Sequence, residues 1–199
     1  MIHALGVLVA ALGASGIASS GGSARPALAR LAAAGVAPAQ SVTTLEGQPV
    51  DPFAGRAPAT ALVFIHPDCP VSNRYIPELN RLAGAFQAAG IRLFAVYPGR
   101  EDSESAIREH SATFGLRVPA LRDPDFQLAE RAGATMTPEA AVFVRGRLVY
   151  RGRIDDRAPR LGVWRAAPRV RDLADVLERI SEGRPVAFRA TQPVGCYIR

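Results

Sequence analysis

Apolar runs alternate with amphipathic stretches along most of the 199-residue chain. Residues 59–66 (ATALVFIH) and 91–97 (IRLFAVY) are continuous apolar runs, typical of strands that are buried on both faces. Between them, residues 70–89 place apolar side chains three and four positions apart, which predicts a helix that Gly90 ends. The same reasoning predicts a hairpin at 41–52, helices at 101–114 and 126–132, a strand at 118–121, a hairpin at 140–154 and an amphipathic helix at 168–181.

This order of elements predicts a single α/β domain. Strand–helix–strand alternation, followed by a hairpin and a closing helix, favours a sandwich around a mixed central sheet. At roughly 150 residues per domain, the chain has room for one domain and some additional segments. We place the domain at residues 41–183, and residues 184–199 form a C-terminal tail without helical periodicity.

Composition narrows the class of protein. The chain is 48% hydrophobic and 21% charged, which is a globular balance and excludes wholesale disorder. Two cysteines exclude a disulfide-stapled scaffold and a four-cysteine zinc site. All basic residues are Arg, and from Arg145 onward thirteen of them stand against six acidic residues. The aromatic interleaving of nucleic-acid grooves is missing, so we expect no nucleic-acid partner.

The first 24 residues predict export. An apolar and small-residue run from Ala4 to Ala18 has about the length of a secretory h-region and is too short to span a bilayer comfortably. We therefore assign residues 1–24 to a signal peptide and the Ala- and Pro-rich residues 25–40 to a linker, with an extracytoplasmic, for example periplasmic, location. Because no Arg or Lys precedes the apolar run, a cytoplasmic protein is the alternative. Membrane attachment is expected only through an uncleaved signal.

The candidate chemistry centres on Cys69, in the segment FIHPDCPVSN (residues 64–73). Cys69 stands between a buried strand and a helix whose first turn contains Pro70. Unpaired backbone N–H groups and the positive end of the helix dipole favour its thiolate, which is the nucleophilic form. A protonated His66 would add to this effect, and Asp68 would oppose it. A buried structural cysteine is the alternative interpretation.

Three features of the chain resemble the thioredoxin-like superfamily and, within it, the redoxin (AhpC/TSA-like) family. Cys69 starts a helix after a buried strand, Pro77 follows eight residues later in that helix, and Thr137-Pro138 precedes the strand hairpin at the family's cis-proline position. The resemblance covers about residues 40–183 and implies a thioredoxin-like three-layer α/β sandwich with a mixed central sheet. It also implies a substrate groove beside Cys69, for which the binding residues are Thr137, Pro138, Pro70, Ser72 and His66.

The chain also departs from the patterns of its relatives. Ser72 stands where thioredoxins have their second cysteine, and a serine cannot form the disulfide. Leu62 and His66 occupy the positions of the Pro and the Thr/Ser with which peroxiredoxins bind peroxide. Asn73 replaces the second cysteine of copper-handling relatives. We therefore expect no metal site and no cofactor.

Cys196, three residues from the end, is the only other cysteine. The thiol that resolves an oxidised Cys69 is therefore either Cys196 or an external molecule. The tail from Ser181 to Cys196 contains Gly and Pro, is predicted to be mobile, and is long enough to reach Cys69 in the same chain or in a partner chain. A cysteine that only packs or stays free is the alternative for Cys196. Some peroxiredoxins carry a resolving cysteine in such a tail.

The combined prediction is a thiol-based redox enzyme. Cys69 attacks a disulfide or a peroxide, Cys196 or an external thiol resolves the product, and an external reductant restores the thiols. The expected partners are protein or small-molecule thiols, disulfides and peroxides. A thiol peroxidase proper and a non-enzymatic thioredoxin-fold binding module are the alternatives.

Three other features have simpler interpretations. We interpret Asp155-Asp156 as turn and ion-pair residues, Trp164 as a packing residue on a loop, and His110 as a solvated residue on a polar helix.

Overall fold

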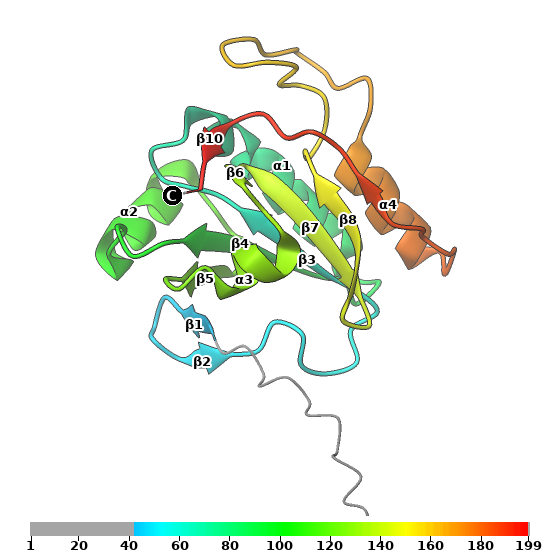
Figure 1. The fold of residues 1–199 in the computed structure, drawn as a ribbon, viewed down its shortest axis with the longest axis horizontal. Coiled ribbons are helices and arrows are strands. Elements are labelled where there is room, and N and C mark those ends of the chain that lie inside the picture. The colour runs from blue at the N-terminus through cyan, green and yellow to red at the C-terminus, as the bar shows by residue number, and fades with distance from the viewer. Residues whose placement is uncertain (1–41, 199) are drawn as a thin grey trace, which may run out of the picture. The chain divides into compact units, whose positions relative to one another are not determined.

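An eight-stranded mixed sheet forms the centre of the computed structural model, which describes residues 42–198 (Figure 1). The predicted signal peptide and linker lie outside the described residues. The strand order is β2-β1-β5-β4-β3-β7-β8-β9. Strands β3, β4 and β5 run parallel to one another, and the remaining pairs are antiparallel except β8–β9. The strands are β1 Val42–Thr44, β2 Pro49–Val50, β3 Thr60–Phe64, β4 Arg92–Pro98, β5 Ala120–Asp123, β7 Glu139–Val144, β8 Arg147–Gly152 and β9 Arg189–Ala190.

Helices cover both faces of the sheet. Successive side chains of β3 point to opposite faces, so Ala61 and Val63 enter one apolar core, and Leu62 and Phe64 enter the other. The first core includes side chains of α1, α2 and α4, and the second includes side chains of α3. The predicted three-layer α/β sandwich is therefore confirmed. The helices are α1 Pro70–Gln87, α2 Glu104–Phe114, α3 Gln127–Ala132 and α4 Asp172–Ser181.

Two regions differ from the prediction. Helix α4 begins at Asp172 instead of residue 168, because the Asp156 carboxylate accepts hydrogen bonds from the N–H groups of Arg169 (2.7 Å) and Val170 (3.0 Å). The C-terminal tail, predicted to be mobile, forms two short strands. Strand β9 pairs with β8, and β10 (Cys196–Tyr197) pairs antiparallel with β6 (Met136–Thr137) in a separate two-stranded sheet.

No helix within residues 42–198 combines the length and the apolar character needed to cross a membrane.

Candidate functional site

Cys69 occupies the N-cap position of α1 and is completely buried. Its thiol donates a hydrogen bond to the carbonyl oxygen of Thr137, with a sulfur–oxygen distance of 3.1 Å. The Thr137-Pro138 peptide bond is cis, as the resemblance implied. The start of α1 and the segment before β7 therefore meet at the Cys69 sulfur, although 68 residues separate them in the sequence.

The surroundings of Cys69 favour its thiolate. Burial by itself raises the pKa of this thiol, but hydrogen bonds to the sulfur from Cys196, Ser72 and Thr137 outweigh burial, so the pKa lies below the ordinary value. Ser72 contributes both its hydroxyl and its backbone N–H. The Ser72 hydroxyl is completely buried beside Cys69.

Strand β10 brings the second cysteine to this sulfur. Cys196 is the register partner of Thr137, and the Ile198 N–H donates to the Thr135 carbonyl oxygen (2.9 Å). The backbone at Gly195 lies close to Thr137, since a Cβ atom on Gly195 would overlap the Thr137 carbonyl group. Burial and the hydrogen bond with the Cys69 sulfur raise the pKa of Cys196 to about 11. Both cysteines are free thiols in this structure.

A cavity of about 450 Å³ opens beside the two cysteines. Of the predicted binding residues, His66 and Thr137 line this cavity, and Ser72 lies buried behind Cys69. Pro138 contacts the Gly195 position, and Pro70 starts α1 and is exposed. The cavity also includes residues that sequence reasoning did not single out: Pro98, Gly99, Glu101, Leu161, Gly195, Tyr197 and Ile198.

His66 is fixed by two neighbours at the edge of the cavity. Its Nδ1 atom accepts a hydrogen bond from the Asp68 N–H (3.2 Å). Its Nε2 atom lies 3.6 Å from Asp102 Oδ2, close enough for an ion pair when the imidazole is protonated.

His110 is buried, with 6% of its surface exposed, so the prediction of a solvated residue is wrong. Its Nε2 atom lies 2.8 Å from Asn73 Oδ1 and therefore donates to it, which leaves Nδ1 to accept from the Tyr97 hydroxyl (2.9 Å). Asn73 in turn donates to the Pro67 carbonyl oxygen (2.9 Å). This chain of hydrogen bonds connects β4 and α2 with the loop that leads into Cys69. Burial lowers the pKa of His110.

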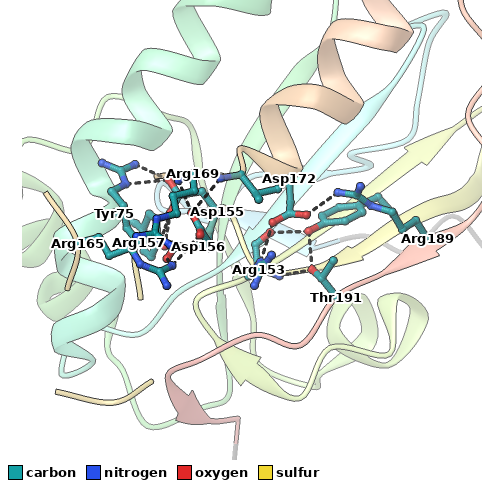
Figure 2. A network of polar contacts seen from close by, with 12 residues as sticks. Tyr75, Arg153, Asp155, Asp156, Arg157, Arg165, Arg169, Asp172, Arg189 and Thr191 are labelled. Carbon is teal, nitrogen blue, oxygen red and sulfur yellow. Dashed lines mark hydrogen bonds and ion pairs between the residues drawn. The ribbon is translucent and has the colours of Figure 1, made fainter. Parts of the chain in front are cut away.

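A buried carboxylate on α4 holds the tail ahead of β10 (Figure 2). Asp172 pairs with Arg153 and Arg189, each at 2.6 Å. Thr191 hydrogen-bonds to the Tyr150 hydroxyl (2.8 Å) and accepts from the Arg153 N–H (3.1 Å). These contacts anchor the tail five residues before Cys196.

Asp155 and Asp156 serve as buried ion-pair residues, as predicted (Figure 2). Asp155 accepts from the Tyr75 hydroxyl (2.6 Å) and pairs with Arg157 (2.7 Å). Asp156 pairs with Arg165 (2.6 Å). Trp164 packs edge-on against Tyr75, with ring centroids 4.9 Å apart, which confirms its packing role. Both carboxylates are thus occupied in holding the segment between β8 and α4.

Within residues 42–198, no three His, Cys, Asp or Glu side chains cluster in a way that could hold a metal ion.

The fold and this geometry define a thioredoxin-like protein with a cysteine at the start of its first helix. Solved structures with a similar fold include an uncharacterized conserved protein from Geobacillus kaustophilus (26% identity, TM-score 0.65, 80% of this chain and 87% of that chain). A hypothetical protein from Sinorhizobium meliloti 1021 is 23% identical, with a TM-score of 0.65 over 79% of this chain and 88% of that chain. A secreted Mycobacterium tuberculosis disulfide oxidoreductase homologous to E. coli DsbE is 20% identical, with a TM-score of 0.50 over 73% and 96% of the two chains.

The model of the AhpC/TSA family matches residues 34–151, more than half of the chain. The chain therefore belongs to the AhpC/TSA family of thioredoxin-like redox proteins. No curated protein matches the sequence.

Proposed function

We propose that the protein is a two-cysteine thiol–disulfide redox enzyme, in which Cys69 is the nucleophile and Cys196 is the resolving thiol. The observation that carries this proposal is the position of Cys196: it pairs with Thr137, whose carbonyl oxygen accepts from the Cys69 thiol, and both cysteines line the same cavity. The contrast in pKa supports the two roles, since the pKa of Cys69 is lowered and that of Cys196 is raised to about 11. The thiolate forms at Cys69 first, and thiolates are the attacking species.

The proposed cycle has three steps. The Cys69 thiolate attacks a disulfide sulfur or a peroxide oxygen, giving a mixed disulfide with loss of a thiolate, or a sulfenic acid with loss of hydroxide or alkoxide. Cys196 then attacks the Cys69 sulfur, loses its proton, and forms the Cys69–Cys196 disulfide with release of the second thiol or of water. An external thiol reductant returns both residues to thiols.

The complete burial of Cys69 favours a small peroxide over a protein disulfide as the oxidant. In the reduced structure, β10 pairs with β6 beside Cys69, and the 450 Å³ cavity is lined by Cys69 and Cys196. This observation supports thiol peroxidase activity as the specific form of the redox function. Comparing the rates of Cys69 oxidation by hydrogen peroxide and by a protein disulfide distinguishes the two oxidants.

We further propose an extracytoplasmic location. The apolar run at residues 4–18 supports this assignment, as does the fold shared with a secreted oxidoreductase. Amino-terminal sequencing of the mature protein from its native cell tests it, and an intact Met1 would contradict it.

Peptide mapping without reductant, after mild oxidation of the reduced protein, tests the two-cysteine cycle. A peptide that joins Cys69 to Cys196 is the expected product, and Cys69→Ser abolishes all reaction with oxidant without unfolding the protein. A Cys69 sulfinic acid beside a free Cys196 would contradict the resolving role. Two unmodified thiols after prolonged oxidation would favour the binding module instead.

A further inference from the structure

The connection between β8 and α4 projects beyond the sheet (gold in Figure 1). Its tip carries an exposed apolar side chain. The Val163 N–H donates to the Arg160 carbonyl oxygen (3.1 Å), and Gly162 has a φ of 76°. A glycine with positive φ at this position fits a tight turn that presents the preceding residue, Leu161, outward. Leu161 is 62% exposed.

This segment, the 157–165 loop, is fixed at its base. The Arg157 guanidinium pairs with the buried Asp155 and lies over the rings of Tyr75 and Trp164. The Arg165 N–H donates to the Arg157 carbonyl oxygen (2.8 Å), which joins the two ends of the loop. Because both ends are held, Leu161 cannot turn inward to join a core. The structure therefore maintains an exposed leucine at a defined place.

That place is the mouth of the cavity beside the two cysteines. Leu161 and Tyr197, which is 73% exposed, are two of the five large apolar side chains that stand exposed within residues 42–198, and both line the cavity. Asp68 and Glu101 also line it, and neither has an ion-pair partner among the described residues. Exposed apolar groups beside unpaired charge of one sign are typical of interaction surfaces.

We propose that this mouth is the docking surface for a protein dithiol that reduces the Cys69–Cys196 disulfide. The carboxylates of Asp68 and Glu101 favour a partner whose cysteine lies in a segment with basic residues, and Leu161 and Tyr197 favour apolar residues beside that cysteine. The proposal rests on the proposed function, because it requires the Cys69–Cys196 disulfide. A protein segment can bury the exposed Leu161 side chain when it docks, whereas a small reductant is too small to cover it.

The reduction proceeds by attack on the accessible sulfur. Cys69 is completely buried and Cys196 is partly exposed, so the partner's thiolate attacks Cys196. The S–S bond breaks, Cys69 leaves as a thiolate, and a mixed disulfide joins the partner to Cys196. The partner's second thiol then attacks its own mixed-disulfide sulfur, which closes a disulfide in the partner and releases Cys196. The partner loses two electrons and two protons, and the two cysteines gain them.

Single-cysteine peptides test the surface on the oxidised full-length protein. Three peptides differ only in the residues beside their cysteine, which are Leu and Arg, Leu and Glu, or Ser and Gly. The rate at which each peptide thiol opens the Cys69–Cys196 disulfide is divided by its rate with hydroxyethyl disulfide, which corrects for thiol reactivity. We expect the Leu/Arg peptide to react about fivefold faster than the Leu/Glu peptide, and Glu101→Gln to narrow this difference.

A substitution at the loop tip is the second part of the test. Leu161→Ser lowers the rate of the Leu/Arg peptide about fivefold and leaves the rate of dithiothreitol unchanged. Phe188→Ser is the matched control, because Phe188 is 61% exposed and does not line the cavity. Equal rates for all three peptides, or equal slowing of dithiothreitol by Leu161→Ser, overturns the docking proposal. If no Cys69–Cys196 disulfide forms on oxidation, the dithiothreitol reaction gives no signal either, and the proposed function has failed instead.

Discussion

Residues from three segments that lie far apart in the chain lower the pKa of Cys69. Ser72 belongs to the first turn of α1, Thr137 to β6 and Cys196 to β10. Only the first of these donors is local, so only its contribution follows from the position of Cys69 before a helix. The other two depend on how the sheet brings the chain together.

Removing a donor should raise the pKa of Cys69. A hydrogen bond to the sulfur stabilises the thiolate relative to the thiol. Ser72→Ala and Cys196→Ala should therefore raise the titration midpoint of Cys69 and slow its alkylation at neutral pH. In the unchanged protein, the midpoint of the Cys69 titration lies below that of an ordinary thiol. Iodoacetamide alkylation of Cys69 across pH, followed by mass spectrometry, measures it. Ser181→Ala on α4 is the control, and an unmoved midpoint in both test variants would contradict the assignment.

Buried His110 should make stability depend on pH. Its pKa is lowered by burial, whereas in the unfolded chain it returns to about 6.5. Below that pH the unfolded state binds more protons than the folded state, so the free energy of unfolding falls as the pH decreases from 7 towards the folded pKa. We expect His110→Gln to lower stability by about 1–3 kcal/mol at pH 7 and to reduce the loss between pH 7 and pH 5. Urea unfolding at both pH values measures this, and an equally steep pH dependence in the variant would count against it.

At the scale of elements, the position of β10 depends on a glycine. Gly195 lies against the Thr137 carbonyl group where no Cβ atom fits. Gly195→Ala therefore displaces β10 and moves Cys196 away from Cys69. We expect formation of the disulfide to slow by about tenfold or more, because small misplacements of reacting atoms are costly. Alkylation of Cys69 by a bulky maleimide should become faster.

Gly84→Ala is the control for this prediction, because a Cβ atom there meets open space. If Gly195→Ala forms the disulfide as fast as the unchanged protein, β10 does not set the reach of Cys196.

Helix α4 contributes to the same arrangement through Asp172. Its carboxylate pairs with Arg153 on one side and with Arg189 of β9 on the other. Removing one member of a buried ion pair costs about 3–5 kcal/mol, so Asp172→Asn should destabilise the protein by an amount near the lower value. The loosened tail should also form the disulfide more slowly. Asp175→Asn, on the exposed face of the same helix, should change neither the stability nor the rate of disulfide formation. Denaturant unfolding measures the stability, and peptide mapping measures the disulfide.

The elements that sequence periodicity predicts are those with one dominant local cause. The apolar run of β3 and the three-and-four spacing of α1 predict buried strands and an amphipathic helix at nearly their observed bounds. The buried His110 and the strands of the tail do not follow from periodicity. Their partners, Tyr97 for the histidine and β6 for Cys196, are distant in the sequence and share no local pattern with them.

At the scale of the whole molecule, four of the thirteen arginines from Arg145 onward have a structural role. Arg153, Arg157, Arg165 and Arg189 pair with buried carboxylates around α4 and the 157–165 loop (Figure 2). The count of six acidic residues in this half already includes the three aspartates of these pairs, so the excess of basic charge remains after the pairs are formed. Removing one partner of such a pair leaves the other charge without compensation, so these pairs help to hold the geometry of this region.

Closing the Cys69–Cys196 bond should stabilise the molecule as a whole. The bond encloses nearly the whole domain, and a loop of that length removes enough chain entropy from the unfolded state to contribute about 4–5 kcal/mol in the chain-entropy model. Because β10 already holds Cys196 beside Cys69 in the reduced structure, the native state need rearrange little to form the bond. Guanidinium unfolding should therefore show a higher midpoint for the oxidised than for the reduced protein. This difference in midpoint should vanish in Cys196→Ser. If the reduced protein is as stable as the oxidised one, bond formation strains the fold by as much free energy as it gains by constraining the unfolded chain.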